Sequence, residues 1–296
     1  MIYLESFKLP TAELEEHFFA SQAFVPAAIY PWRFLSTKDF TDIDCEKITI
    51  LYGGNGSGKS TALNAIAKKI GIERTTPYNR GYYYYDEFIA RCSCKTNPAM
   101  IGDLADLTTM ITSDDVFDTM LTTRKRNMQH ELRTNALDEF RFEVMDEPIR
   151  GFHCDSPESI DNYIRSVNAR NKSRRGYIRG EIGDKERTYS NGETAYLRII
   201  RQIKEGLYLL DEPENSLSAK WQSKLAEFIK MSADSCDCQF IIATHSPILM
   251  AYPNADILEF SEKGIHKVDY RETEHYKITK QFIDNPDRMV KYLLND

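Results

Sequence analysis

The run from Gly53 to Thr61 carries the strongest chemical signal in the sequence, because its residue types and spacing suit a triphosphate. It follows a short β-prone stretch over 48–52 and precedes a helical pattern. Glycines at this spacing let successive backbone N–H groups surround phosphate oxygens, and the following helix presents its positive end to the same charge. Lys59 would reach the β- and γ-phosphates, and the Ser60 hydroxyl would coordinate Mg²⁺. The residues predicted to bind ATP in this way are Gly53, Gly54, Asn55, Gly56, Ser57, Gly58, Lys59, Ser60 and Thr61.

Two adjacent acids end an apolar strand that we expect over 207–210. Asp211 is placed to join the magnesium shell, and Glu212, one residue further, to orient or deprotonate an attacking water. Phosphoryl transfer needs this division of labour between two carboxylates. Alone, the pair would equally suit a strand that ends in a solvated acidic turn. Together with the glycine-rich run, it predicts hydrolysis of the bound nucleotide.

A third motif lies 21 residues before Asp211 and consists of Ser190, Asn191, Gly192 and Glu193. Ser190 and Glu193 have the spacing of a capping box, so one interpretation is simply a well-capped helix. The other interpretation is an anion site, because a capped helix N-terminus with a nearby glycine binds negative charge. That site would face the γ-phosphate of a nucleotide held by another subunit.

His245 follows a strand that we expect over 239–243, and it lies between Thr244 and Ser246. It would sense the γ-phosphate if the strand ended beside the nucleotide. Otherwise it would be an ordinary histidine at a strand end.

In chain order these four motifs resemble those of the ATP-binding-cassette ATPases. The likeness is greatest to their soluble branch of chromosome-maintenance, RecF-like and OLD-like proteins, often labelled AAA family ATPases. The resemblance covers about 1–71 and 185–260. It implies a head-to-head homodimer that sandwiches two ATP molecules. Each ATP would lie between Lys59 of one subunit and Ser190, Asn191, Gly192 and Glu193 of the other.

The resemblance also assigns roles within the site. Asp211 matches the magnesium-site acid, Glu212 the catalytic glutamate, His245 the switch histidine, and 215–218 the dimer-contacting D-loop. Two positions depart from the family pattern. The motif over 190–193 matches the family's signature motif, but Asn191 replaces its usual first glycine. Asparagine tolerates left-handed backbone better than most residues. No glutamine lies between Gln22 and Gln129 to form the Q-loop, so either 113–115 or Gln129 would take that part.

The elements around these motifs predict an α/β P-loop fold. Short apolar strands alternate with helices in the C-terminal third, which is typical of a mostly parallel sheet flanked by helices. We expect an N-terminal antiparallel β part, a long helix from Ser113 and another from 156–157. The predicted organisation is an N-terminal part of the core over 1–79, a mainly helical insertion over 80–185, and the C-terminal part of the core over 186–296.

Composition excludes several classes of protein. The chain has 296 residues, 42% hydrophobic and 28% charged, with a formal net charge of −7. That is an ordinary globular composition, and it does not describe a surface covered with cations. The apolar runs are too short for a membrane-spanning helix, which needs roughly 20 residues. The N-terminus lacks the pattern of a secretory signal, so we expect a cytoplasmic protein with reduced cysteines.

Weaker signals leave alternatives open. The basic cluster would contact nucleic acid, with Tyr163 and Tyr177 available to stack, or would form a solvated loop or protein-docking surface. Cys92 with Cys94 and Cys236 with Cys238 would either bind zinc or remain free thiols. Tyr30, Trp32 and Phe34 would stack on adenine or pack in the core. The basic cluster consists of Arg165, Arg170, Lys172, Arg174, Arg175 and Arg179.

The sequence therefore predicts an ATPase that closes a homodimer around ATP and reopens it by hydrolysis. By family analogy its work would be delivered to DNA or to a protein effector of the nuclease or toxin kind, in bacterial defence. Two alternatives remain: the ATPase subunit of a membrane transporter, and a non-catalytic scaffold or sensor gated by ATP.

Overall fold

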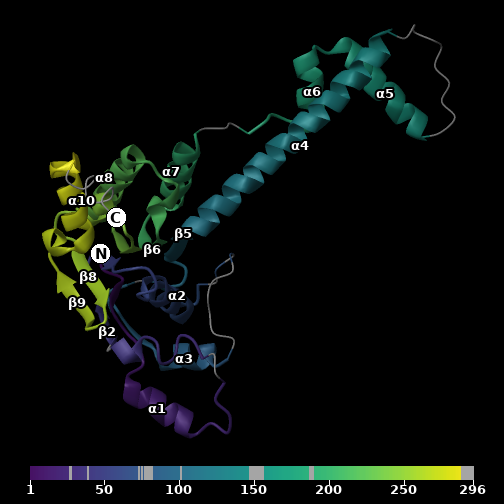
Figure 1. The fold of residues 1–296 in the computed structure, drawn as a ribbon. Helices are drawn as coiled ribbons and strands as arrows, with labels where there is room; N and C mark the ends of the chain where they lie inside the picture. Colours follow the sequence, from purple (N-terminus) through teal and green to yellow (C-terminus); the bar gives the residue numbers. More distant parts are fainter. Residues whose placement is uncertain are drawn as a thin grey trace. The chain divides into compact units, whose positions relative to one another are not determined.

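The computed structural model describes residues 1–26, 29–38, 40–72, 74, 76, 83–100, 102–146, 157–186 and 190–287. The chain divides into two compact units (Figure 1). The first combines Met1–Phe117 with Ser190–Asp296, and the second is Asp118–Tyr189. Among the described residues, no helix has the length and apolar character that a bilayer crossing requires.

A six-stranded sheet forms the centre of the first unit, in the order β5-β6-β7-β3-β8-β9. Its strands pair in parallel except for β9, which is antiparallel to β8. Every residue of β3, β6 and β7 is buried, as expected for parallel strands covered on both faces. The predicted mostly parallel sheet is confirmed. The strands are β3 (Ile48–Tyr52), β5 (Thr108–Thr112), β6 (Gly206–Asp211), β7 (Cys238–Ala243), β8 (Asp256–Ser261) and β9 (Gly264–Val268).

Helices flank this sheet, as predicted. Helix α2 packs on β6 and β7, and α8 packs on β7. Gly71, in left-handed conformation at φ 103°, ends α2, and Thr273 caps the start of α10. The helices of this part are α2 (Lys59–Ile70), α7 (Asn191–Gln202), α8 (Ala219–Ser235), α9 (Pro247–Met250) and α10 (Glu274–Asp284), with 3₁₀ turns η2 (Pro213–Ser216) and η3 (Tyr270–Glu272).

A second, antiparallel sheet of order β2-β1-β4 confirms the expected N-terminal β part. Beside it lies an aromatic cluster in which the Trp32 ring stacks on Phe18, with centroids 4.7 Å apart, and meets Phe88 edge-on. Trp32 is therefore a core residue. The elements are β1 (Leu4–Lys8), β2 (Asp42–Asp44), β4 (Ser93–Thr96), α1 (Ala12–Ala20), α3 (Tyr85–Arg91) and the 3₁₀ turn η1 (Ser36–Lys38).

The second unit is helical. Helix α4 (Ser113–Asp146) starts at the predicted residue in the first unit and continues into the second, which adds α5 (Pro157–Asn171) and α6 (Arg174–Ile182). Leu137, Val144, Ala169 and Tyr177 form its buried core.

The helical insertion begins later in the chain than the sequence indicated. The prediction placed it over 80–185, whereas the second unit spans Asp118–Tyr189. Helix α3 and strands β4 and β5 belong to the first unit, where β4 pairs with β1 and β5 with β6. Both strands are short and only partly buried, so they lack the apolar runs that revealed β6 and β7.

Candidate functional site

The glycine-rich run forms a tight loop between β3 and α2. Gly53, Gly56 and Gly58 have φ values of 149°, 73° and 110°, which L side chains rarely adopt. A Cβ at Gly53 would lie 2.6 Å from the carbonyl oxygen of Phe260, and one at Gly58 would lie 2.8 Å from Leu35 Cδ2. Glycine is therefore required at these two positions by both backbone conformation and space.

Lys59 is the cation of this loop and is buried, with 4% of its surface exposed. Its ammonium donates to the carbonyl oxygens of Gly53 at 2.8 Å and Gly54 at 3.1 Å. Burial lowers the pKa of Lys59, while the nearby carboxylates, Glu212 first, act in the opposite direction. A buried ammonium bonded only to neutral carbonyls is suited to an anionic ligand.

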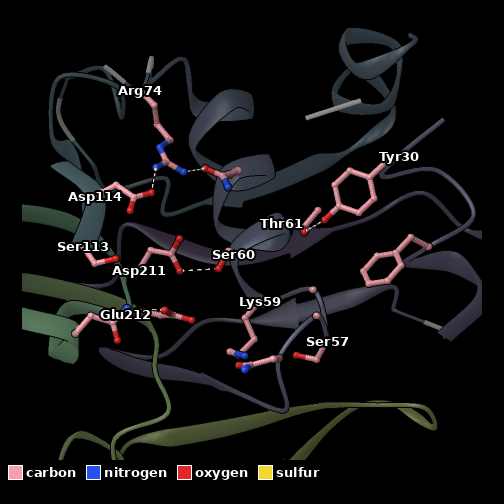
Figure 2. Close-up of a pocket in the computed structure, with 16 residues that line it drawn as sticks. Tyr30, Ser57, Lys59, Ser60, Thr61, Arg74, Ser113, Asp114, Asp211 and Glu212 are labelled. Atoms are coloured by element: carbon pink, nitrogen blue, oxygen red, sulfur yellow. Dashed lines mark hydrogen bonds and ion pairs between the residues drawn. The ribbon is translucent and has the colours of Figure 1, made fainter. Parts of the chain in front are cut away.

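Ser60 and Asp211 meet although they are 151 residues apart in sequence. The Ser60 hydroxyl donates to Asp211 Oδ1 at 2.8 Å, because α2 begins beside the end of β6 (Figure 2). Asp211 is 9% exposed, and burial raises its pKa to about 6 despite the Ser60 hydrogen bond. A hydroxyl and a buried carboxylate at this spacing are oxygen ligands of the kind that Mg²⁺ prefers, so the donor set fits the predicted metal.

These groups line one cavity of about 590 Å³ in the first unit (Figure 2). A volume of several hundred Å³ is typical of small-molecule sites. The cavity brings together the loop, the two acids and residues from four further segments of the first unit. Its lining consists of Tyr30, Phe34, Asn55, Gly56, Ser57, Gly58, Lys59, Ser60, Thr61, Asn64, Arg74, Ser113, Asp114, Asp211, Glu212 and Asn215.

Glu212 has a left-handed backbone, with φ 48°, immediately after β6. Its amide donates to the carbonyl of Ala243, and its Oε2 accepts from the Asn215 side chain at 2.8 Å. His245 Nε2 lies 3.7 Å from Glu212 Oε1. Burial is the main cause of a lowered pKa of His245, and Lys59 lowers it further. The two side chains thus face each other; Glu212 lines the cavity, whereas His245 is not among its lining residues.

The signature motif forms the start of α7. Ser190 caps the helix by accepting from the amide of Glu193 at 3.4 Å, and both Ser190 and Asn191 are exposed. A Cβ at Gly192 would lie 3.0 Å from Trp221 Cδ1, so glycine permits close packing against α8. The capping prediction is confirmed. None of the four signature residues lines the cavity described above.

The aromatic residues before the loop separate into two groups. Tyr30 and Phe34 line the cavity, and the Tyr30 hydroxyl hydrogen-bonds to the Thr61 side chain. Their rings lie 5.5 Å apart, whereas Trp32 belongs to the core. Of the three aromatic residues, Tyr30 and Phe34 therefore lie at the cavity and Trp32 does not.

Ser113 and Asp114, the first two residues of α4, line the cavity, while Gln129 lies within the second unit. Sequence reasoning missed Arg74, whose guanidinium also reaches the cavity. It donates to Asn64 Oδ1 at 2.9 Å and lies 3.9 Å from Asp114 Oδ2. A single arginine in an irregular segment gives no periodic or motif signal, so nothing in the sequence pointed to it.

The basic cluster of the second unit is largely paired. Arg174 donates through Nε to Asp138 at 2.7 Å, Arg179 lies 2.8 Å from Asp184, and Arg165 lies 4.0 Å from Glu181. Tyr177, which the sequence offered as a stacking residue, is 1% exposed, so that expectation is wrong. It was wrong because helical spacing places Tyr177 on the inner face of α6, within the unit's core.

The cysteine pairs do not form a metal centre in the part of the chain that the structure describes, which leaves out Cys154. No group of three or more His, Cys, Asp or Glu side chains there could hold an ion. The Cys92 thiol donates to the carbonyl of Phe88, and the Cys238 thiol to that of Lys204. Burial raises the pKa of Cys92 to about 12, which disfavours the thiolate that zinc requires.

The mostly parallel sheet, the glycine loop between β3 and α2 and the acids at the end of β6 define an α/β fold of the P-loop kind. Residues 158–251 match the family described as "AAA domain, putative AbiEii toxin, Type IV TA system". This match confirms the predicted resemblance to proteins labelled AAA family ATPases. No curated protein sequence matches the chain.

Solved structures give distant likenesses. The Smc head domain of Pyrococcus furiosus, bound to the C-terminal domain of ScpA, is 14% identical, with TM-score 0.43, 95% of this chain covered and 100% of that one. The cbiO1 protein of Clostridium perfringens, part of an ABC transporter complex, is 15% identical with TM-score 0.42 and full coverage of both chains. These likenesses are too distant to carry an activity or a residue role to this protein.

Proposed function

We propose that the protein binds ATP with magnesium and hydrolyses it within a homodimer. The observation that carries the proposal is the meeting of Lys59, the Ser60–Asp211 pair and Glu212 on one cavity. The loop amides and Lys59 would hold the phosphates. Ser60 and Asp211 would hold Mg²⁺, which neutralises phosphate charge when bound.

Glu212 is the proposed general base. Its carboxylate lies at the cavity edge, fixed on one side by Asn215 and faced on the other by His245. A water held by Glu212 would lose its proton to that carboxylate as it attacks the γ-phosphorus, and ADP would be the leaving group. His245 would stabilise charge on the γ-phosphate.

The position of the signature motif, 190–193, supports the proposed homodimer. Ser190 and Asn191 are exposed at the N-terminus of α7 and do not line their own subunit's cavity. A capped helix N-terminus is suited to an anion. We propose that this end closes on the γ-phosphate of the partner subunit, and that closure is coupled to DNA or to a protein effector of the nuclease or toxin kind. The toxin–antitoxin wording of the matched family supports a role in bacterial defence.

Glu212→Gln is the first test of hydrolysis. The variant should bind Mg–ATP with unchanged affinity, lose turnover by at least about 100-fold, and accumulate an ATP-bound dimer that is visible by light scattering. Glu227→Gln, an exposed substitution on α8, is the matched control and should behave as wild type. A Glu212→Gln protein that hydrolyses at the wild-type rate would remove Glu212 from its role.

Subunit mixing tests the composite site. Lys59→Ala and Ser190→Arg proteins should each be inactive alone. When they are mixed, each heterodimer regains one site built from the intact loop of one subunit and the intact signature of the other. Recovery of ATPase activity on mixing supports a site shared between two subunits. A mixture that stays inactive contradicts it.

A further inference from the structure

Glu214 is a buried carboxylate that neither the motifs nor the proposed chemistry uses. It lies in η2, three residues after Asp211, with 9% of its surface exposed. Its Oε1 accepts three hydrogen bonds, all from the turn that follows β7. The donors are the Thr244 hydroxyl at 2.7 Å, the His245 amide at 2.7 Å and the Ser246 amide at 3.1 Å.

This arrangement has a cost. Glu214 Oε2 is buried and has no hydrogen-bond partner, and burial raises the pKa of the Glu214 carboxyl. A buried oxygen without a hydrogen-bond partner is unfavourable, because it has lost its hydrogen bonds to water and gained none in the protein. A buried carboxylate with one unpartnered oxygen calls for an explanation beyond packing.

We explain the buried carboxylate by the turn that it binds, 244–246, which contains His245. His245 belongs to that turn, and its Nε2 lies 3.7 Å from Glu212 Oε1. Glu212 and Glu214 lie on the same short segment after β6. The three hydrogen bonds to Glu214 therefore connect the segment that contains Glu212 to the turn that contains His245. Ser246 is held from a second direction, because its hydroxyl donates to Gln222 at 2.7 Å.

We propose that Glu214 is a positioning residue that fixes the turn over 244–246 and so holds His245 against Glu212. Three charge-assisted bonds to one oxygen restrict the position of the turn more than neutral contacts would. The inference rests on the proposed ATPase function for its kinetic consequence. The geometric consequence, a fixed and partly buried His245, does not depend on turnover.

Kinetics of Glu214→Ala give the first readout. We expect kcat to fall by about 10- to 100-fold, because the histidine and the glutamate no longer share a fixed geometry. The dissociation constant for ATP should change by less than about threefold, because the phosphate loop is untouched. Glu214→Gln should lose less than Glu214→Ala, since the amide oxygen can still accept from the turn, and it serves as the test protein if the alanine variant fails to fold.

A double-mutant cycle distinguishes positioning from a separate contribution. If Glu214 acts through His245, Glu214→Ala combined with His245→Ala should be no slower than His245→Ala alone. Effects that multiply would overturn the proposal. Glu15→Gln is the matched control, because Glu15 is also a buried carboxylate with one unpartnered oxygen, and it accepts from Arg33 and Ser36 in the N-terminal part. It should leave kcat unchanged.

NMR titration of His245 separates this proposal from the proposed function. In Glu214→Ala the freed turn should expose the ring, and the lowered pKa of His245 should rise toward its ordinary value; Glu15→Gln should not change it. A folded Glu214→Ala protein with an unchanged His245 titration refutes the positioning role. A wild-type protein without ATPase activity would refute the proposed function, and the titration would still decide the role of Glu214.

Discussion

The two units use charged side chains in opposite ways. In the first unit Lys59 and Asp211 are buried at the cavity, and their protein contacts are a pair of backbone carbonyls and one hydroxyl. In the second unit Arg174 and Arg179 are exposed and lie against carboxylates. Burying charge without an equal counter-charge is costly, so it persists where a ligand completes the site, whereas exposed ion pairs need no such reason. The comparison teaches that burial, more than the number of charges, separates a binding site from a solvated surface.

Removing the buried ammonium should give the largest effect. Lys59→Ala should abolish ATP binding measured by calorimetry, because the cation that meets the β- and γ-phosphates is lost. Lys68→Ala, near the other end of α2, is the control and should bind as wild type does. An unchanged ATP affinity in the Lys59→Ala variant would contradict the proposal that Lys59 and the glycine-rich loop bind the phosphates.

Asp211→Asn should have opposite effects on stability and function. The folded-state pKa of Asp211 is about 6, above its ordinary 3.8, so folding is favoured when the group is protonated. Stability from this source is fully present below pH 3.8 and is lost as pH rises through about 6. Without nucleotide, the variant should therefore exceed wild type in unfolding free energy by about 2–3 kcal/mol at neutral pH.

Urea unfolding between pH 4 and pH 8 would measure this difference, together with magnesium-dependent turnover, which the variant should lose. The gap between the two proteins should open as the pH rises from about 4 to about 6 and then stay constant. Asp211→Asn could instead be less stable than wild type at neutral pH, or the difference in unfolding free energy could be independent of pH. Either result would show that burial of the ionised Asp211 carboxylate does not destabilise the folded protein.

Much of the first unit could be predicted because its strongest elements are local patterns. The glycine loop, the apolar strands over 48–52 and 207–210, and the cap at Ser190 each occupy a few consecutive residues. Arg74 and Glu214 could not be predicted, since each depends on contacts between segments distant in sequence. For Glu214 a signal did exist, a second glutamate two residues after Glu212, but nothing local distinguishes it from a solvated acid.

The smallest expected effect concerns the second unit and compares two neighbouring arginines. Arg174 is engaged by Asp138, whereas Arg175 is exposed and has no ion pair among the residues that the structure describes. If the cluster contacts DNA, Arg175→Gln should weaken binding and reduce the slope of log affinity against log salt by about one, while Arg174→Gln changes it less. Fluorescence anisotropy with duplex DNA at several salt concentrations would measure both slopes. Equal slopes in both variants and in wild type would mean that exposed arginines in this unit serve solvation or a protein contact, and would sharpen the contrast with the buried charges of the cavity.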